Sequence, residues 1–229
     1  MSPIAANWQA VRRRIESAAR AAGRAADSVR LVAVSKSFPP EAVREAADAG
    51  QLDFGENYVQ EALEKIQRLG RLGLTWHYIG PIQSNKTRVI AAHFDWVHTI
   101  EREKIAARLS QARDPGRPEL QVCIQVNVSG EASKGGVAPE ELAPLAKQVA
   151  ALPRLKLRGL MAIPEPTPDE KSQRRRFAQL RELRARLNRE GLALDTLSMG
   201  MSADVEAAIA EGATIVRVGT AIFGERNAP

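Results

Sequence analysis

The sequence predicts an α/β fold, a single (β/α)8 barrel of the TIM type with one extra N-terminal helix, formed by residues 1–229. Eight short apolar segments alternate with eight segments of helical periodicity, in units of about 20–40 residues, as in parallel barrels. An open nucleotide-binding sheet would usually carry a glycine-rich loop after its first strand, and residues 36–41 contain no glycine. No linker rich in proline, glycine or serine divides the chain into two domains.

The first expected element is an amphipathic helix that begins after Asn7. Trp8, Val11 and Ile15 recur at helical spacing, and Asn7 is a favourable N-cap residue. Residues 1–30 are also rich in alanine and arginine and poor in acids, as mitochondrial presequences are. We favour the helix.

The strands and helices that follow are marked by their composition and their caps. Helices are expected to begin at Pro39-Pro40, at a capping box formed by residues 167–170, at Ser202 and at Thr220. The eight expected strands cover residues 32–36, 52–55, 76–80, 95–100, 120–128, 155–163, 194–199 and 214–219.

Lys36 ends the first strand and is the first candidate for chemistry. Side chains alternate along a strand, so Val32, Val34 and Lys36 share one face. If this face lines the barrel interior, the amine stands at the mouth above two valines. A partly desolvated amine loses its proton more readily, and the neutral form attacks carbonyl carbons to give a Schiff base. The alternative is a strand-end lysine that reaches into water.

Active sites of such barrels lie at the carboxyl ends of the strands, so the residues that follow the strands form the candidate site. These residues are Lys36, Glu56, Asn57, Gln83 to Lys86, Lys134, Met161, Met199 to Ser202, Gly219 and Thr220.

Two features at this end of the barrel suggest a phosphate. Gly219 and Thr220 begin the last helix, where free N–H groups and the helix dipole favour an anion. Ser202 could donate its hydroxyl to the same oxygens, or it could be an N-cap only, and Asp204 nearby would repel a dianion. Gly219 could equally be a turn glycine.

Arg217 interrupts an apolar strand on the face that it shares with Ile215. A guanidinium there is costly unless it meets an anion or another acceptor. We therefore expect Arg217 to serve a phosphate or the ring nitrogen of a bound heterocycle.

Charge and hydropathy limit the possible partners. The formal net charge of +6 at pH 7 could indicate a polyanion, but acids are interspersed along the chain and only 4% of its residues are aromatic, so we expect no nucleic-acid partner. The run Arg174 to Arg176 precedes Phe177 and Leu180 at helical spacing and reads as the solvated face of a helix. No stretch approaches the ~20 apolar residues that cross a membrane, and no secretory segment is visible, so we expect a cytoplasmic protein.

Cysteine and histidine usage argues against disulfides and metals. The single cysteine, Cys123, lies in an apolar run and is expected to be a small buried hydrophobe in a reducing compartment. His77 and His98 lie in apolar strands and are expected to be satisfied core residues. With three histidines and one cysteine scattered among strands, the chain has no set of transition-metal ligands.

Six ordered motifs resemble the pyridoxal phosphate homeostasis proteins of the YggS/PROSC type. The resemblance is specific, because several motifs are long and they extend nearly from end to end of the chain. The motifs are Val34-Ser35-Lys36, FGENYVQE at 54–61, HYIGPIQSNK at 77–86, Gly159-Leu160-Met161, LSMGMS at 197–202 and VRVGTAIFG at 216–224.

This resemblance implies a barrel like the N-terminal domain of alanine racemase, with pyridoxal 5′-phosphate (PLP) held as a Schiff base on Lys36. It implies that the phosphate lies near the residues after the last two strands and that Arg217 lies close to the cofactor. Lys134 matches a loop lysine proposed in the family to assist cofactor exchange. The full expected set of cofactor-binding residues is Lys36, Asn57, Met161, Ser202, Arg217, Gly219 and Thr220.

Two positions depart from the family pattern. Tyr78 stands where the family more often has Phe or Met, which matters little. Phe38 stands where many members have a second lysine, which puts a role of that amine in cofactor transfer in doubt for this chain.

The resemblance favours a PLP-binding homeostasis protein without evident turnover, expected to be a monomer, with PLP-dependent apoenzymes as candidate recipients. The alternative is a PLP-dependent amino-acid racemase. Racemases of this type take a tyrosine base from an additional β-domain, but this chain has only Tyr58 and Tyr78 and ends about ten residues after its eighth strand. A third hypothesis is a class I aldolase that uses Lys36 on a phosphorylated sugar. Colour separates the hypotheses, because a protein with PLP bound as a Schiff base is yellow and an aldolase without the cofactor is colourless.

Overall fold

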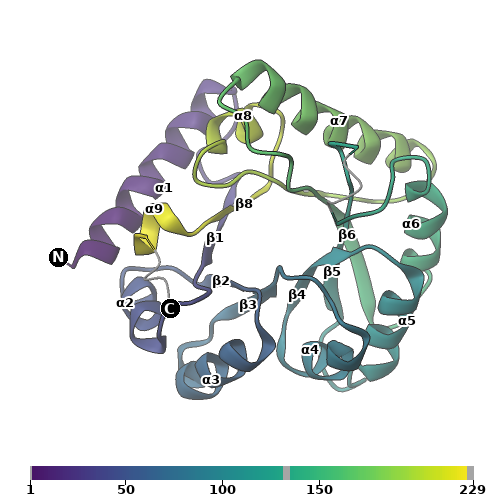
Figure 1. The fold of residues 1–229 in the computed structure, drawn as a ribbon, viewed down its shortest axis with the longest axis horizontal. Coiled ribbons are helices and arrows are strands. Elements are labelled where there is room, and N and C mark those ends of the chain that lie inside the picture. The colour runs from purple at the N-terminus through teal and green to yellow at the C-terminus, as the bar shows by residue number, and fades with distance from the viewer. Residues whose placement is uncertain (1, 131–134, 226–229) are drawn as a thin grey trace.

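The eight strands form one closed parallel barrel in which each strand pairs with its neighbours in chain order and β8 pairs with β1. This computed structural model describes residues 2–130 and 135–225, and the barrel occupies its centre (Figure 1). The predicted (β/α)8 fold is confirmed. The strands are β1 (Arg30–Val34), β2 (Asp53–Glu56), β3 (Thr75–Tyr78), β4 (Trp96–Ile100), β5 (Leu120–Gln125), β6 (Leu155–Met161), β7 (Thr196–Ser198) and β8 (Ile215–Val218).

The helices form a ring outside the barrel (Figure 1). Their apolar faces pack on the outward-facing side chains of the strands, and this layer between helices and barrel is the main core. The α-helices are α1 (Pro3–Ala21), α2 (Pro40–Asp48), α3 (Val59–Leu69), α4 (Thr87–His93), α5 (Glu103–Ala112), α6 (Leu142–Ala150), α7 (Glu170–Arg189), α8 (Val205–Ala210) and α9 (Thr220–Phe223), and the 3-10 helices are η1 (Gly70–Leu72) and η2 (Ser84–Lys86).

The extra N-terminal helix is confirmed, but it begins earlier than predicted. Ser2, not Asn7, is the N-cap residue, and its Oγ accepts from Ala5 N at 3.3 Å. Asn7 lies inside α1, and its Nδ2 donates to the carbonyl oxygen of Ile222 at 3.1 Å. The helix therefore ties the start of the described chain to α9, beside which it lies in Figure 1.

Strand β1 ends at Val34, two residues before Lys36, so the prediction that Lys36 lies in the strand is wrong. Ser35 N still donates to Gly55 O at 3.1 Å, and Phe38 N then closes a turn on Ser35 O at 3.1 Å. Ser37 has a φ of +67°, which no residue of a regular strand adopts. Lys36 is thus a turn residue above the end of the strand.

Two predicted helix caps are also wrong. Asp169 caps α7 by accepting from Ser172 N at 3.0 Å, whereas Thr167 lies outside the helix and accepts from Asp169 N at 3.2 Å. The residue at the N-cap position of α8 is Asp204, two positions after Ser202. Ser202 is therefore not committed to a helix start.

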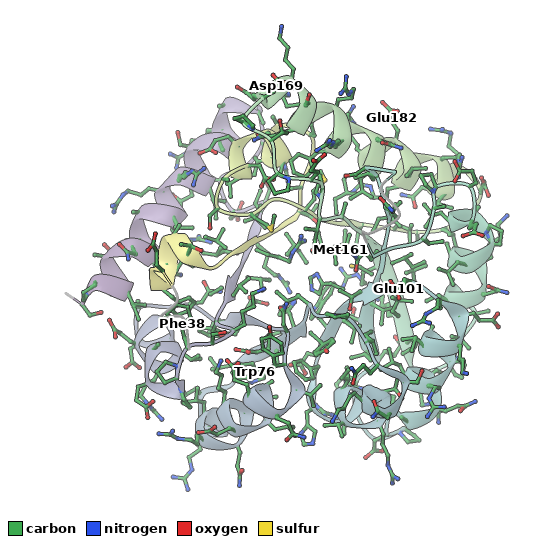
Figure 2. All side chains as sticks on the ribbon, viewed as in Figure 1. Phe38, Trp76, Glu101, Met161, Asp169 and Glu182 are labelled. Carbon is green, nitrogen blue, oxygen red and sulfur yellow. The ribbon has the colours of Figure 1, made fainter. Side chains whose placement is uncertain are left out.

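The barrel interior is filled by a small buried cluster. It contains Val32, Trp96, Cys123, Met161 and Ile215, and Figure 2 places Met161 near the centre of the barrel. The predicted inward face of β1 and the predicted burial of Cys123 are confirmed. No helix in the described ranges 2–130 and 135–225 is long and apolar enough to span a bilayer.

Candidate functional site

A pocket of ≈ 260 Å³ opens at the carboxyl ends of the strands and gathers six of the seven predicted site residues. It lies where barrel enzymes place their chemistry. Polar groups from β8 and from the turns after β1, β2, β7 and β8 meet apolar side chains there. Its lining consists of Val34, Lys36, Asn57, Ile79, Ile163, Met201, Ser202, Ala203, Arg217, Gly219 and Thr220.

The Lys36 turn lies above a buried charge cluster that the sequence analysis did not identify. Lys65 of α3, 1% exposed, places its Nζ 2.7 Å from Ser35 O and 2.7 Å from Glu56 Oε1, and it also contacts Glu61. Ser35 Oγ donates to Glu56 Oε1 at 2.5 Å, and Ser37 N donates to Glu61 Oε1 at 2.7 Å. Residues on both sides of Lys36 are therefore fixed by the same cluster.

Glu56 is the central acceptor of this cluster. Burial raises the pKa of its carboxyl, while the Lys65 ammonium and the Ser35 hydroxyl act in the opposite direction. The motif residues Glu56 and Glu61 thus have a structural task beneath the site. The signal for it in the sequence was a lysine four residues after Glu61 on the helix stripe that packs on the barrel.

Arg217 points into the barrel from β8, as predicted, and lines the pocket while it is only 4% exposed. Its NH1 donates to Ser198 Oγ at 2.6 Å and its NH2 to Ala162 O at 3.0 Å. Burial lowers the pKa of the guanidinium to about 10, so it remains charged at neutral pH. The site therefore holds a buried cation braced from below by two acceptors.

His77 and His98 are buried, as predicted, but they are not isolated. His77 Nδ1 and His98 Nε2 lie 2.9 Å apart, and His98 Nδ1 lies 2.7 Å from Ser198 Oγ, which is also an acceptor for Arg217. Burial lowers the pKa of both imidazoles, for His98 well below 6.5, and His77 and Arg217 lower it further at His98. Sequence reasoning missed this link, although inward-facing positions on neighbouring strands β3 and β4 could have suggested it.

The turn from β8 into α9 lies directly beside the end of β1. A Cβ atom at Gly219 would lie 3.1 Å from Val34 O, so glycine allows this close approach. Ser202 faces the same pocket, and its backbone oxygen accepts from Arg14 NH1 of α1 at 2.7 Å. The neighbouring Asp204 accepts from Met201 N at 2.6 Å, and burial raises its pKa. The Asp204 carboxylate near Ser202 therefore accepts a hydrogen bond from the backbone of its own turn.

Asn57 supplies an unsatisfied polar atom at the pocket. Its Oδ1 is buried and has no hydrogen-bond partner among the residues that the structure describes. Gly80 packs against its backbone, where a Cβ atom would lie 2.5 Å from Asn57 O. A buried amide oxygen of this kind is normally satisfied, and a bound group is one way to satisfy it.

Several of the candidates named from the sequence do not line this pocket, among them Glu56, residues 83–86, Met161, Met199 and Gly200. Met161 is fully buried in the interior cluster and is not among the residues that line the pocket. Lys86 lines a neighbouring pocket of ≈ 390 Å³ together with Tyr58 and Tyr78. Lys134 lies outside the described residues. In the described ranges, no group of three or more His, Cys, Asp or Glu side chains is suited to a metal ion.

Comparison with known proteins decides the family. The family model of the alanine racemase N-terminal domain matches residues 4–227. A pyridoxal phosphate homeostasis protein of Pseudomonas aeruginosa is 63% identical over 227 residues, which are 99% of this chain and 97% of that protein. The protein of the same name from Escherichia coli is 53% identical over 230 residues, 99% of this chain and 98% of that one. The chain belongs to the family of pyridoxal phosphate homeostasis proteins.

A solved structure supports the same family. PipY of Synechococcus elongatus, determined with PLP bound, is 42% identical to this chain with a TM-score of 0.80, over 86% of this chain and 93% of that one. The resemblance inferred from six motifs is confirmed. One departure from the family pattern now has a structural reading: Phe38 stacks on Phe223 of α9, with ring centroids 5.1 Å apart.

Proposed function

We propose that this member of the family binds PLP covalently through Lys36 and holds and releases it without turnover of an amino acid. The observation that carries the proposal is the convergence of Lys36, Arg217 and the turn Gly219–Thr220 on one pocket at the carboxyl ends of the strands. The homeostasis proteins of the two bacteria above and the PLP-bound PipY support the same ligand. PLP-dependent apoenzymes are the proposed recipients.

The residues present fit the chemistry of PLP. Ser202, Gly219 and Thr220 offer hydroxyl and backbone N–H donors for the phosphate, and the unsatisfied Asn57 Oδ1 offers an acceptor. Arg217 supplies a charged donor in the floor of the pocket. The apolar lining suits the flat face of a heterocycle.

The chemistry that the cofactor supplies is its aldehyde, with which an amine forms a carbon–nitrogen double bond and releases one water. Lys36 supplies this amine from a turn whose backbone is fixed on both sides. Neither tyrosine of the chain lines the pocket, because Tyr58 lies in the neighbouring one and Tyr78 is buried with its hydroxyl on Pro81 O at 3.0 Å. The described part of the site thus has no tyrosine to act as a second base, which supports binding over racemisation.

The test loads purified protein with PLP, removes the excess and records the visible absorption. Borohydride reduction and peptide mass spectrometry then locate the pyridoxyl group. We expect a yellow protein labelled at Lys36, a colourless Lys36→Ala variant, and no turnover of alanine or serine at ordinary enzyme rates.

Lys86→Ala is the matched control, because Lys86 is a half-buried lysine of the adjacent pocket. It should keep both colour and label. A Lys36→Ala protein that stays yellow, or a label on another lysine, would refute the proposal. A colourless wild type would instead favour the hypothesis of a class I aldolase that uses Lys36 on a phosphorylated sugar.

A further inference from the structure

Five side chains form an unbroken series of hydrogen bonds through the barrel interior, which we call the interior chain. It runs from Asp53 through His77, His98 and Ser198 to Arg217. The consecutive distances are 2.9 Å from Asp53 Oδ1 to His77 Nε2, 2.9 Å from His77 Nδ1 to His98 Nε2, 2.7 Å from His98 Nδ1 to Ser198 Oγ and 2.6 Å from Ser198 Oγ to Arg217 NH1. Each link has the length of a good hydrogen bond.

The chemistry of its two ends fixes the direction of the interior chain. Arg217 can only donate, so Ser198 Oγ accepts from it. With a carboxylate acceptor at the Asp53 end and both imidazoles neutral, Ser198 directs its own hydroxyl hydrogen to His98 Nδ1. His98 then carries its hydrogen on Nε2 and donates to His77 Nδ1. His77 in turn carries its hydrogen on Nε2 and donates to the carboxylate of Asp53. Every donor meets one acceptor while both imidazoles stay neutral.

The surroundings of the interior chain favour this neutral arrangement. His77 and His98 have no exposed surface, and His77 stacks on Trp96 with centroids 5.5 Å apart. The charged groups that face the imidazoles are Arg217 above and Arg30, Asp53 and Asp95 below. A proton added to His77 Nδ1 would face the Nε2–H of His98, and a proton added to His98 Nδ1 would face the hydroxyl hydrogen of Ser198.

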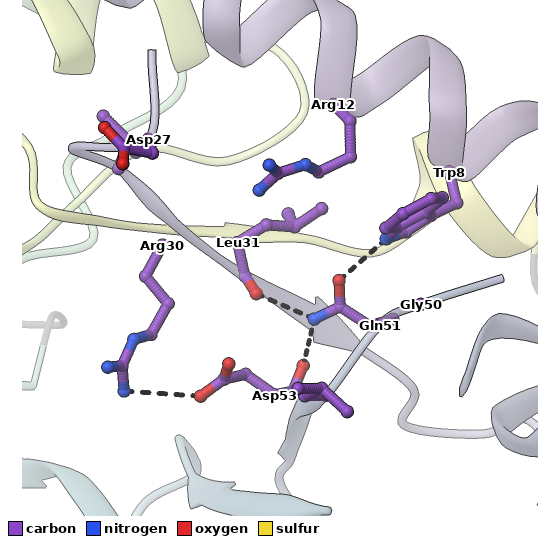
Figure 3. Close-up of a pocket in the computed structure, with 10 residues that line it drawn as sticks. Trp8, Arg12, Asp27, Arg30, Leu31, Gly50, Gln51 and Asp53 are labelled. Carbon is purple, nitrogen blue, oxygen red and sulfur yellow. Dashed lines mark hydrogen bonds and ion pairs between the residues drawn. The ribbon is translucent and has the colours of Figure 1, made fainter. Parts of the chain in front are cut away.

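The acceptor end is anchored on the opposite side of the barrel from the cofactor pocket. Asp53 lines a second pocket, of ≈ 370 Å³, at the start of β1 and β2 (Figure 3). There Arg30 NH1 lies 3.4 Å from the Asp53 carboxylate, and Gln51 Nε2 donates to Asp53 O at 2.5 Å. A fixed negative charge at this end is therefore connected, bond by bond, to the cation in the other pocket.

We propose that Asp53, His77 and His98 are positioning residues that hold the Ser198 hydroxyl as an acceptor for Arg217, and so fix the guanidinium against the ring of bound PLP. That the bound ligand is PLP rests on the proposed function, whereas the sequence of hydrogen bonds from Asp53 to Arg217 is a property of the protein alone. Arg217 would otherwise be free to turn its NH1 toward the cofactor pocket, since Ala162 O alone holds only its NH2.

The first test needs no ligand. In protein labelled with ¹⁵N-histidine and free of PLP, nitrogen shifts report the tautomer of each imidazole. We expect His77 and His98 to be neutral with hydrogen on Nε2 at about pH 7. His93, which is exposed on α4, provides the signals of a solvated imidazole in the same sample. Hydrogen on Nδ1 of either buried ring, or a doubly protonated ring, would overturn the interior chain.

The second test breaks one link. Ser198→Ala removes the acceptor, and Thr196→Val removes a buried hydroxyl two residues earlier on β7 that donates to Asp195 Oδ1 at 2.7 Å. We expect Ser198→Ala to weaken PLP binding about fivefold to tenfold and to shift the visible absorption maximum of the loaded protein, while Thr196→Val leaves both unchanged. Asp53→Asn should shift the spectrum in the same direction.

The spectrum separates positioning from simple stabilisation, because a lost packing contact lowers stability without moving the absorption maximum. Identical binding and spectra for Ser198→Ala and Thr196→Val would overturn the proposal. A wild type that binds no PLP would refute the proposed function and with it the role of Arg217 toward PLP, but the imidazole signals would still decide whether the interior chain exists.

Discussion

Lys65 Nζ lies 2.7 Å from the carbonyl oxygen of Ser35, the residue that precedes Lys36. The same ammonium group contacts Glu56 and Glu61, so one buried cation joins α3 to the end of β2 and to the turn that carries Lys36. The position of Lys36 thus depends on a charge that never reaches the pocket. The free energy of this cluster can be tested directly.

Replacing Lys65 by methionine is predicted to destabilise the fold strongly. The change leaves Glu56 buried without its cation, and breaking a buried pair in this way costs about 3–5 kcal/mol. The matched control is Lys147→Met, because Lys147 and Glu190 form an exposed pair 3.1 Å apart whose loss should cost about 0–1 kcal/mol. Urea unfolding measures both. Equal losses for the two variants would show that the cluster does not stabilise the Lys36 turn.

A second prediction concerns the pH dependence of stability. Burial lowers the pKa of His77 and His98 from 6.5 in the folded state, whereas unfolding exposes them. As the pH falls below about 6.5, the unfolded chain binds protons that the folded chain excludes, so the free energy of unfolding falls by up to about 1.4 kcal/mol per pH unit for each ring. Above that pH the contribution is complete and constant.

The measurement compares urea unfolding of the wild type and of His98→Gln between about pH 7.5 and 5.5. The difference between the two curves isolates the imidazole from the carboxyl groups that titrate in the same range. We expect a shallower loss for His98→Gln and an unchanged slope for His93→Gln, which alters an exposed side chain. Parallel curves for the wild type and His98→Gln would show that His98 is protonated equally in both states.

The sequence predicted the architecture well, because strand count and the inward face of each strand follow from short-range patterns. Val32 and Arg217 face the interior as their alternation indicated. The sequence did not predict the end of β1, because the turn that follows it is fixed by residues distant in sequence: Lys65 bonds Ser35 O and Glu61 bonds Ser37 N. The hydrogen bond between His77 and His98 likewise can be predicted only when the register of the neighbouring strands β3 and β4 is known.

Cys123 is predicted to be inert in the folded protein. It has no exposed surface inside the barrel, and burial raises the pKa of its thiol to about 12, so almost no thiolate is present at pH 8. Since it is the chain's only cysteine, a thiol reagent such as Ellman's reagent should label no group in native protein and one group in urea. Fast labelling without denaturant would mean that the barrel opens readily at β5.

Gly80→Ala is predicted to damage the pocket from outside it. A Cβ atom there would lie 2.5 Å from Asn57 O and 2.8 Å from Asn57 Cα, and because both are backbone atoms, β2 and β3 must move apart where they end. Overpacking of this kind costs about 1–3 kcal/mol, and the displaced Asn57 should weaken PLP binding. Gly70→Ala is the control, since Gly70 has helical dihedrals and an added Cβ atom there would have no neighbour within 4 Å.

Binding and unfolding measured together show how the damage at Gly80 arises. If the pocket is altered through Asn57, PLP binding falls in both Gly80→Ala and Asn57→Ala, but only Gly80→Ala loses the stability expected of overpacking. The double variant should then bind PLP no more weakly than Asn57→Ala alone, because the side chain that the clash displaces is already gone. Additive losses of binding in the double variant would instead mean that the close packing of Gly80 acts on another part of the pocket.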